Sequence, residues 1–238
     1  MKSNQVGLIW NWIFNMIRYN LKIIFANKFI WFLLAALAFF VGVLMITLFS
    51  KGKIDAGTIF TLLLYPGLLL VFYPTVFGIQ NDEDTRVLEI LFGIPDYRYK
   101  VWLVRLILIY FVVFLILLLL AIFCSWALLP FSVFNMAWHL MFPIFFMGTL
   151  AFLLSTFIKN GIGTGVVMII IGVFFTALMG IIQNSKWNIF LNPFSIPDGM
   201  SENAWKSIVQ DNRIILFVGI ILSLLGGLTS LQKRERFI

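Results

Sequence analysis

Six long apolar stretches are the feature that most constrains the fold of this 238-residue chain. Each stretch is long enough to cross about 30 Å of hydrocarbon as a helix. The strands of a membrane barrel alternate apolar and polar residues, whereas these stretches are apolar on every face. The sequence therefore predicts an all-α membrane protein, a single domain over residues 1–238. Its predicted transmembrane helices are residues 29–49, 57–79, 106–129, 137–158, 164–182 and 214–231.

The composition excludes a soluble globular domain. Hydrophobic residues make up 62% of the chain and charged residues 11%, against roughly one half and one quarter in ordinary soluble domains. The connections between the apolar stretches are too short for a folded aqueous domain of about 100 residues. Any ATP hydrolysis must therefore belong to a partner protein.

The Lys and Arg residues indicate an orientation in the membrane. They stand at the ends of the apolar stretches and do not cluster on a polar face, so a nucleic-acid partner is not expected. With the N-terminus in the cytoplasm, twelve of the 17 fall on the inner side and five on the outer side. This bias predicts a multi-pass protein of the cell's inner (cytoplasmic) membrane with both termini cytoplasmic.

Residues 6–22 are predicted to form an amphipathic helix in the plane of the membrane interface. Asn11, Asn15, Arg18 and Lys22 follow one another at steps of four, three and four, which places them on one polar stripe. Tryptophan at the headgroup level and bases facing anionic lipid are typical of such helices. The expected membrane-interface residues are Trp10, Trp12, Arg18 and Lys22.

Residues 80–100 form an acidic cytoplasmic segment between the second and third spans. Asp82, Glu83 and Asp84 are predicted to begin a short helix, because negative charge suits the free N–H groups of a helix N-terminus. An apolar face follows, and Gly93 and Pro95 end the helix. That apolar face consists of Val87, Leu88, Leu91 and Phe92.

Residues 183–212 are the longest predicted outer segment. Aromatic and aliphatic residues alternate there with Pro193, Pro197 and Gly199. Two short apolar pieces joined by a Pro-Gly turn predict a reentrant segment that enters the outer leaflet or caps the bundle.

The sequence offers no motif for catalysis or for binding a cofactor. A nucleotide-binding Walker A pattern is absent, and Gly161 to Gly165 favours a tight turn with close helix packing over a phosphate loop. His139, the only histidine, has no Cys or carboxylate at helical spacing, so no metal site is expected and a role in bonding helices is favoured. We predict that the chain is not an enzyme.

The residues within the predicted spans indicate which kinds of transport the chain could carry out. None of the six stretches contains Asp, Glu, Lys or Arg, which disfavours a proton-coupled or ion-coupled carrier. An apolar and aromatic interior suits an amphipathic or lipid-like cargo, and it equally suits simple helix packing.

The order of these elements resembles the type-2 ABC exporter permeases, the membrane subunits of ATP-binding-cassette transporters. The plan is an interfacial helix, two spans, a cytoplasmic acidic helix, four more spans and a reentrant segment before the last. The local match lies in Gly78, Glu83, Thr85, Leu88-Glu89, Leu91, Pro95 and Arg98-Tyr99, and the basic tail from Leu231 is also of this kind.

The resemblance implies a half-transporter. Two copies, or this chain and a second permease chain, enclose a path, and separate ATPase subunits bind ATP and Mg. In such permeases the helix after the second span is a coupling helix that docks on the ATPase. The resemblance places this role on Asp82, Glu83, Asp84, Arg86, Leu88, Glu89 and Phe92.

Two questions stay open at the level of the sequence. The cargo of similar proteins ranges over polysaccharide, lipid, peptide, haem and small hydrophobic drugs. The alternative function is a non-transporting membrane scaffold or assembly factor that recruits a soluble partner through the acidic helix.

Overall fold

The computed structural model describes residues 29–49, 54–84, 98–158 and 160–234. These residues form helices joined by loops and turns, with no strand among them. The expected interfacial helix at residues 6–22 and most of the acidic segment, residues 85–97, lie outside the described residues. The helices are α2 (Phe29–Phe49), α3 (Ala56–Asp84), the π-helical turn η1 (Arg98–Leu103), α5 (Val104–Ala127), α6 (Val133–Phe157), α7 (Gly161–Ile182) and α8 (Glu202–Arg234).

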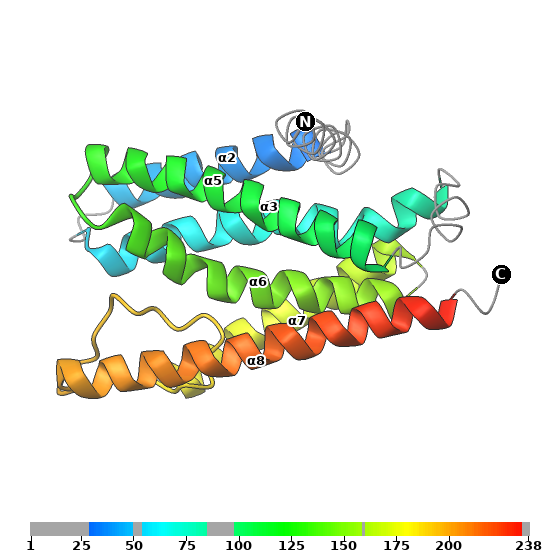
Figure 1. Cartoon of the computed structure of the whole chain (residues 1–238). Helices are drawn as coiled ribbons and strands as arrows, with labels where there is room; N and C mark the ends of the chain where they lie inside the picture. The colour runs from blue at the N-terminus through cyan, green and yellow to red at the C-terminus, as the bar shows by residue number, and fades with distance from the viewer. Residues whose placement is uncertain (1–28, 50–53, 85–97, 159, 235–238) are drawn as a thin grey trace, which may run out of the picture.

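Within the described part of the chain, six helices are long and apolar enough to cross a membrane. This confirms the prediction of an all-helical, multi-pass architecture. The long helices run side by side in alternating directions, so the bundle has two ends (Figure 1). We call the end that contains Asp82 the Asp82 end, and the end that contains Asn192 the Asn192 end.

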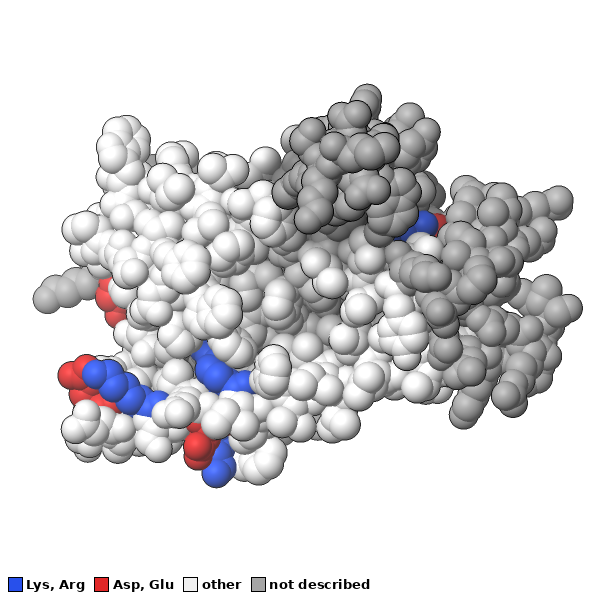
Figure 2. All heavy atoms as spheres, viewed as in Figure 1, with Lys and Arg blue, Asp and Glu red and all other residues white. Residues whose placement is uncertain are grey.

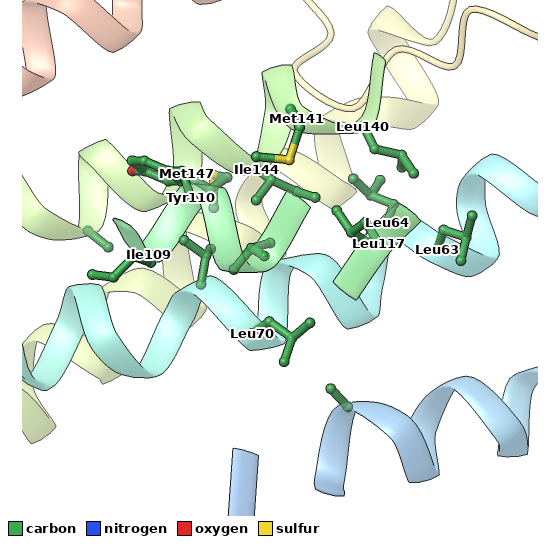
Figure 3. Close-up of a cluster of buried hydrophobic side chains, with 14 of the residues drawn as sticks. Leu63, Leu64, Leu70, Ile109, Tyr110, Leu117, Leu140, Met141, Ile144 and Met147 are labelled. Atoms are coloured by element: carbon green, nitrogen blue, oxygen red, sulfur yellow. The ribbon is translucent and has the colours of Figure 1, made fainter. Parts of the chain in front are cut away.

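Helices α3 and α6 form the centre of the bundle. The most extensive helix pairs are α6 with α8, α3 with α6, and α2 with α3. Fully buried side chains of α3, α5 and α6 meet between these helices (Figure 3). Examples are Leu63 and Leu70 on α3, Leu117 on α5, and Leu140 and Ile144 on α6.

Helices α2 and α7 lie at the edge of the bundle. Only Gly161, Thr164, Gly165 and Met168 of α7 are buried, all in its first half. Large side chains along the rest of α7 are exposed, such as Ile169 and Val173. An apolar surface of this kind suits contact with lipid or with another protein.

Several helices are longer than the apolar stretches that predicted them. α3 continues to Asp84, five residues past the predicted end of the span, and α8 begins at Glu202, twelve residues before the predicted start. The first turns of α8 are amphipathic: Trp205 and Val209 are buried while Glu202 and Lys206 are exposed. Hydropathy marks only the apolar part of a helix, so such ends escape it.

The charged side chains of the described residues gather toward the two ends of the bundle on the face shown in Figure 2. At the Asn192 end, Lys206 pairs with Glu202 at 2.6 Å and Lys186 with Asp211 at 3.4 Å, both exposed. Between these ends, the described residues visible on this face are uncharged, as expected for the part of a bundle that meets hydrocarbon.

Candidate functional site

A buried ion pair joins α3 to α5 at the Asp82 end. The Asp82 carboxylate accepts a hydrogen bond from the Arg105 guanidinium, and both side chains are about 5% exposed. The Arg105 guanidinium also lies over the Trp102 ring, 5.0 Å from its centroid. A buried charge is tolerated when it is paired, so these two residues hold the two helices in one register.

A second polar contact joins α3 to α7 at the same end. Gln80 Oε1 accepts a hydrogen bond from the backbone N–H of Gly161 at 2.6 Å. Asn160 caps α7, because its side chain accepts from the N–H groups of Ile162 and Gly163. A side chain at Gly161 would collide with Gln80 and Phe77, so the glycine allows this close approach.

These contacts test the prediction that Gly161 to Gly165 form a tight turn with close helix packing and not a phosphate loop. The segment forms the first turns of α7 and not a separate tight turn. The expected close helix packing is present, with Gly161 against Gln80 and Phe77. Gln80 and Asn160 occupy the free N–H groups that a phosphate would need.

The three predicted coupling acids that the structure describes do not begin a helix. Asp82, Glu83 and Asp84 form the last described turn of α3, so the predicted helix start at Asp82 is wrong. Within α3, Asp82 has a cationic partner in Arg105, which compensates for the cost of burying its carboxylate. Glu83 and Asp84 are exposed, whereas Asp82 faces inward.

The other predicted site residues have no described placement. Arg86, Leu88, Glu89 and Phe92 of the coupling segment lie outside the described residues, as do Trp10, Trp12, Arg18 and Lys22 of the interfacial helix. The described residues also contain no cluster of three or more metal-ligating side chains.

Arg213 is a buried cation at the Asn192 end. Its guanidinium donates to His139 Nδ1 at 3.3 Å, to Asn212 Oδ1 at 3.0 Å and to the carbonyl oxygen of Leu191 at 3.3 Å. These acceptors are neutral, and the guanidinium also lies over the Phe142 ring at 5.3 Å. Arg213 thus connects α6, α8 and the segment before α8, and His139 has the helix-bonding role favoured by the sequence.

Asparagine side chains hold residues 183–201 against the helix ends. Asn192 donates to the carbonyl oxygen of Gly57 on α3 at 2.8 Å. Asn212 on α8 donates to the carbonyl oxygens of Lys186 and Asn188 at 2.8 and 2.9 Å. The segment therefore covers the Asn192 end of the bundle as a packed structure.

Two hollows adjoin each other along α3 and α7. The apolar groove, a hollow of about 710 Å³ between α2, α3 and α7, is lined by Phe39, Leu69, Phe72, Ile169 and Val173 among others. The polar pocket, a hollow of about 560 Å³ at the Asn192 end, is lined by Asp55, Thr58, Thr61, Gln183, Asn184 and Ser195 among others. Tyr65 and Phe190 line both hollows.

Sequence reasoning missed Gln80, Arg105 and Arg213. Arg105 and Arg213 stand immediately before the predicted third and sixth spans, and the observed helices include both residues. The six apolar stretches themselves contain no Asp, Glu, Lys or Arg, but α5 and α8 begin before their stretches and so include an arginine each. The sequence did contain a signal for the ion pair: Arg105 stands directly before the third apolar stretch, and Asp82 follows the end of the second.

No protein-family model, curated protein or solved structure matches the chain.

Proposed function

We propose that this chain is the permease subunit of an ATP-driven exporter of the type-2 ABC kind, coupled to separate ATPase subunits. The observation that carries the proposal is the Asp82–Arg105 ion pair, which brackets the charged segment at residues 85–97. A force on that segment would reach α3 and α5 together, because the pair fixes its two flanking helices.

The Gln80–Gly161 contact extends this connection to α7. Three helices are therefore linked by buried or half-buried polar contacts at one end of the bundle. The interior of a packed bundle is dense and deforms little. A force on one helix therefore moves the linked helices together, from one packing arrangement to another. This supports a role for the acidic segment, with Glu83, Asp84, Arg86, Leu88, Glu89 and Phe92, as the coupling element.

The apolar groove supports the proposed path. It opens between α2 and α7, the two helices at the edge of the bundle. A second copy of the chain, or a related permease chain, placed against this edge would close the groove into a passage. In this proposal the Asp82 end faces the cytoplasm and residues 183–201 lie at the outer leaflet of the inner membrane.

The test is copurification of the full chain with the products of neighbouring genes, followed by measurement of ATPase activity and export. Charge reversal at Glu83 and Glu89 is expected to weaken ATPase binding and to abolish export. Reversal of Glu202, an exposed acid at the opposite end, is the matched control and should leave both unchanged. Recruitment of a soluble partner without any export would favour the scaffold function instead.

A further inference from the structure

We propose that the polar pocket and the apolar groove together bind one amphipathic molecule, a lipid-like compound with an uncharged polyhydroxylated headgroup. The two hollows adjoin each other, because Tyr65 and Phe190 line both. Their volumes, about 560 and 710 Å³, each fall in the range of about 300–1,000 Å³ that small-molecule sites occupy.

One face of α7 runs through both hollows. Ile169, Gly172 and Thr176 line the apolar groove, and Gly180 and Gln183 line the polar pocket at the same helical spacing. On α3, Thr58 and Thr61 line the pocket and Leu68 and Phe72 line the groove. The lining thus changes from hydrogen-bonding to apolar along the helix axes, as an amphipathic ligand requires.

The chemistry of the polar pocket selects the headgroup. Among the described residues that line it, none is Lys or Arg, and Asp55 is the carboxylate. The Asp55 carboxylate therefore disfavours the binding of a phosphate group in this pocket. Amides and hydroxyls supply both donors and acceptors, which is the set that several neighbouring hydroxyl groups of a sugar or polyol use.

Part of this hydrogen-bonding capacity is unused within the protein. The amides of Asn188 and Asn192 hold the backbone of residues 183–201 and of α3. The side chains of Gln183 and Asn184 make no hydrogen bond to another described residue and are exposed. They are free to bind a headgroup.

Glycine positions allow each hollow to be filled without disturbing the core. A side chain added at Gly172 in the groove or at Gly180 in the pocket meets no heavy atom within 4 Å. Gly42 on α2 is equally open and lines neither hollow, so Gly42→Leu is the matched control for Gly172→Leu and Gly180→Leu.

The experiment measures binding by the full chain in phosphatidylcholine nanodiscs. The probe is a monoglucosyl diacylglycerol with a photoreactive diazirine on one acyl chain, and the labelled peptides are mapped by mass spectrometry. We expect labels on α3 and α7 along the groove. Excess unlabelled monoglucosyl diacylglycerol should compete, whereas phosphatidylglycerol and phosphatidylethanolamine with the same acyl chains should not.

The variants give the decisive comparison. Gly172→Leu and Gly180→Leu are each expected to lower specific labelling by about tenfold, while Gly42→Leu leaves it unchanged. Asn184→Lys should shift the competition toward phosphatidylglycerol. Equal competition by all three lipids would overturn the headgroup assignment, and labelling that ignores both filling variants would overturn the site.

That the bound molecule is cargo rests on the proposed function, but its binding does not. The labelling experiment contains no ATPase and no gradient. Failed export with intact, headgroup-selective labelling therefore counts against the exporter and not against the site. Lost labelling with intact ATPase-dependent export counts against the site alone.

Discussion

Asp82 and Arg105 form an ion pair that is almost fully removed from solvent, across the interface between α3 and α5. The pair joins the two helices that flank residues 85–97. The pair is buried, so it affects stability, and it connects two helices, so it affects coupling. Comparison of single variants with a double variant can separate these two effects.

Removing one partner of this pair should destabilise the protein strongly. Asp82→Asn or Arg105→Met leaves an unpaired buried charge, which typically costs about 3–5 kcal/mol. The measurement is the free energy of unfolding in detergent. The double variant Asp82→Leu/Arg105→Met should recover most of this loss and still lose coupling to the ATPase. Lys206→Gln, at an exposed pair, should leave the free energy of unfolding almost unchanged.

Gln80 should be required for the position of α7. Gln80→Met keeps the size of the side chain but leaves the Gly161 N–H without its acceptor, at a cost of about 1–3 kcal/mol. Hydrogen exchange at the first amides of α7 should accelerate. Gln80→Glu retains an acceptor and is the control. Equal exchange in both variants would show that the contact does not hold α7.

Gly148 marks a close approach of α3, α5 and α6. A Cβ atom at this position would lie 2.7 Å from Tyr110 Oη and 2.8 Å from Val71 Cγ2. Gly148→Ala should therefore cost about 1–3 kcal/mol through overpacking. Gly172→Ala, where the added carbon meets open space, should stabilise α7 by up to about 1 kcal/mol. The comparison of the two unfolding free energies tests the packing.

Cysteine labelling can measure which end of the bundle faces the cytoplasm. Cys124, the only native cysteine, is buried and should not react. In intact cells a membrane-impermeant maleimide should label a cysteine introduced at Glu202 and leave one at Glu83 unlabelled. In inverted membrane vesicles the pattern should reverse. Labelling of Glu83→Cys in intact cells would contradict the proposed orientation.

Asp55 should stabilise α3 in a pH-dependent way. Hydrogen bonds from the Thr58 hydroxyl at 2.6 Å and the Thr58 N–H at 2.7 Å lower the pKa of the Asp55 carboxyl below its ordinary value of 3.8. The stabilisation is thus fully present above about pH 4 and is lost as the pH falls through the lowered pKa. Asp55→Ala should cost about 1 kcal/mol at neutral pH, and the difference from wild type should shrink under acid.

The hydrophobic pattern was sufficient to predict the six long helices. Whether a segment can cross hydrocarbon depends on the composition of that segment alone, which the sequence shows directly. The predicted span at residues 29–49, for example, is helical along its whole length. The amphipathic start of α8 was missed, since Glu202 and Lys206 lower the local hydropathy although Trp205 is buried. Polar helix ends are decided by tertiary partners.

The site was less predictable than the fold. Asp82 was expected at a helix start because acids favour free N–H groups, but its partner Arg105 is 23 residues away and changes the balance. The Gln80–Gly161 contact spans 81 residues and leaves no local pattern. Arg213 on α8 and His139 on α6 are 74 residues apart in the sequence, so their hydrogen bond was visible only in the fold.

The length of α3 has a consequence for where its charges stand in the bilayer. At about 1.5 Å per residue, Asp55 and Asp82 lie about 40 Å apart along the helix axis. A bilayer measures about 40–45 Å when its headgroup layers are included. By this length the two carboxylates fall near opposite headgroup layers, and the Asp82–Arg105 pair, although buried within the protein, lies far from the bilayer midplane, where a charge costs most.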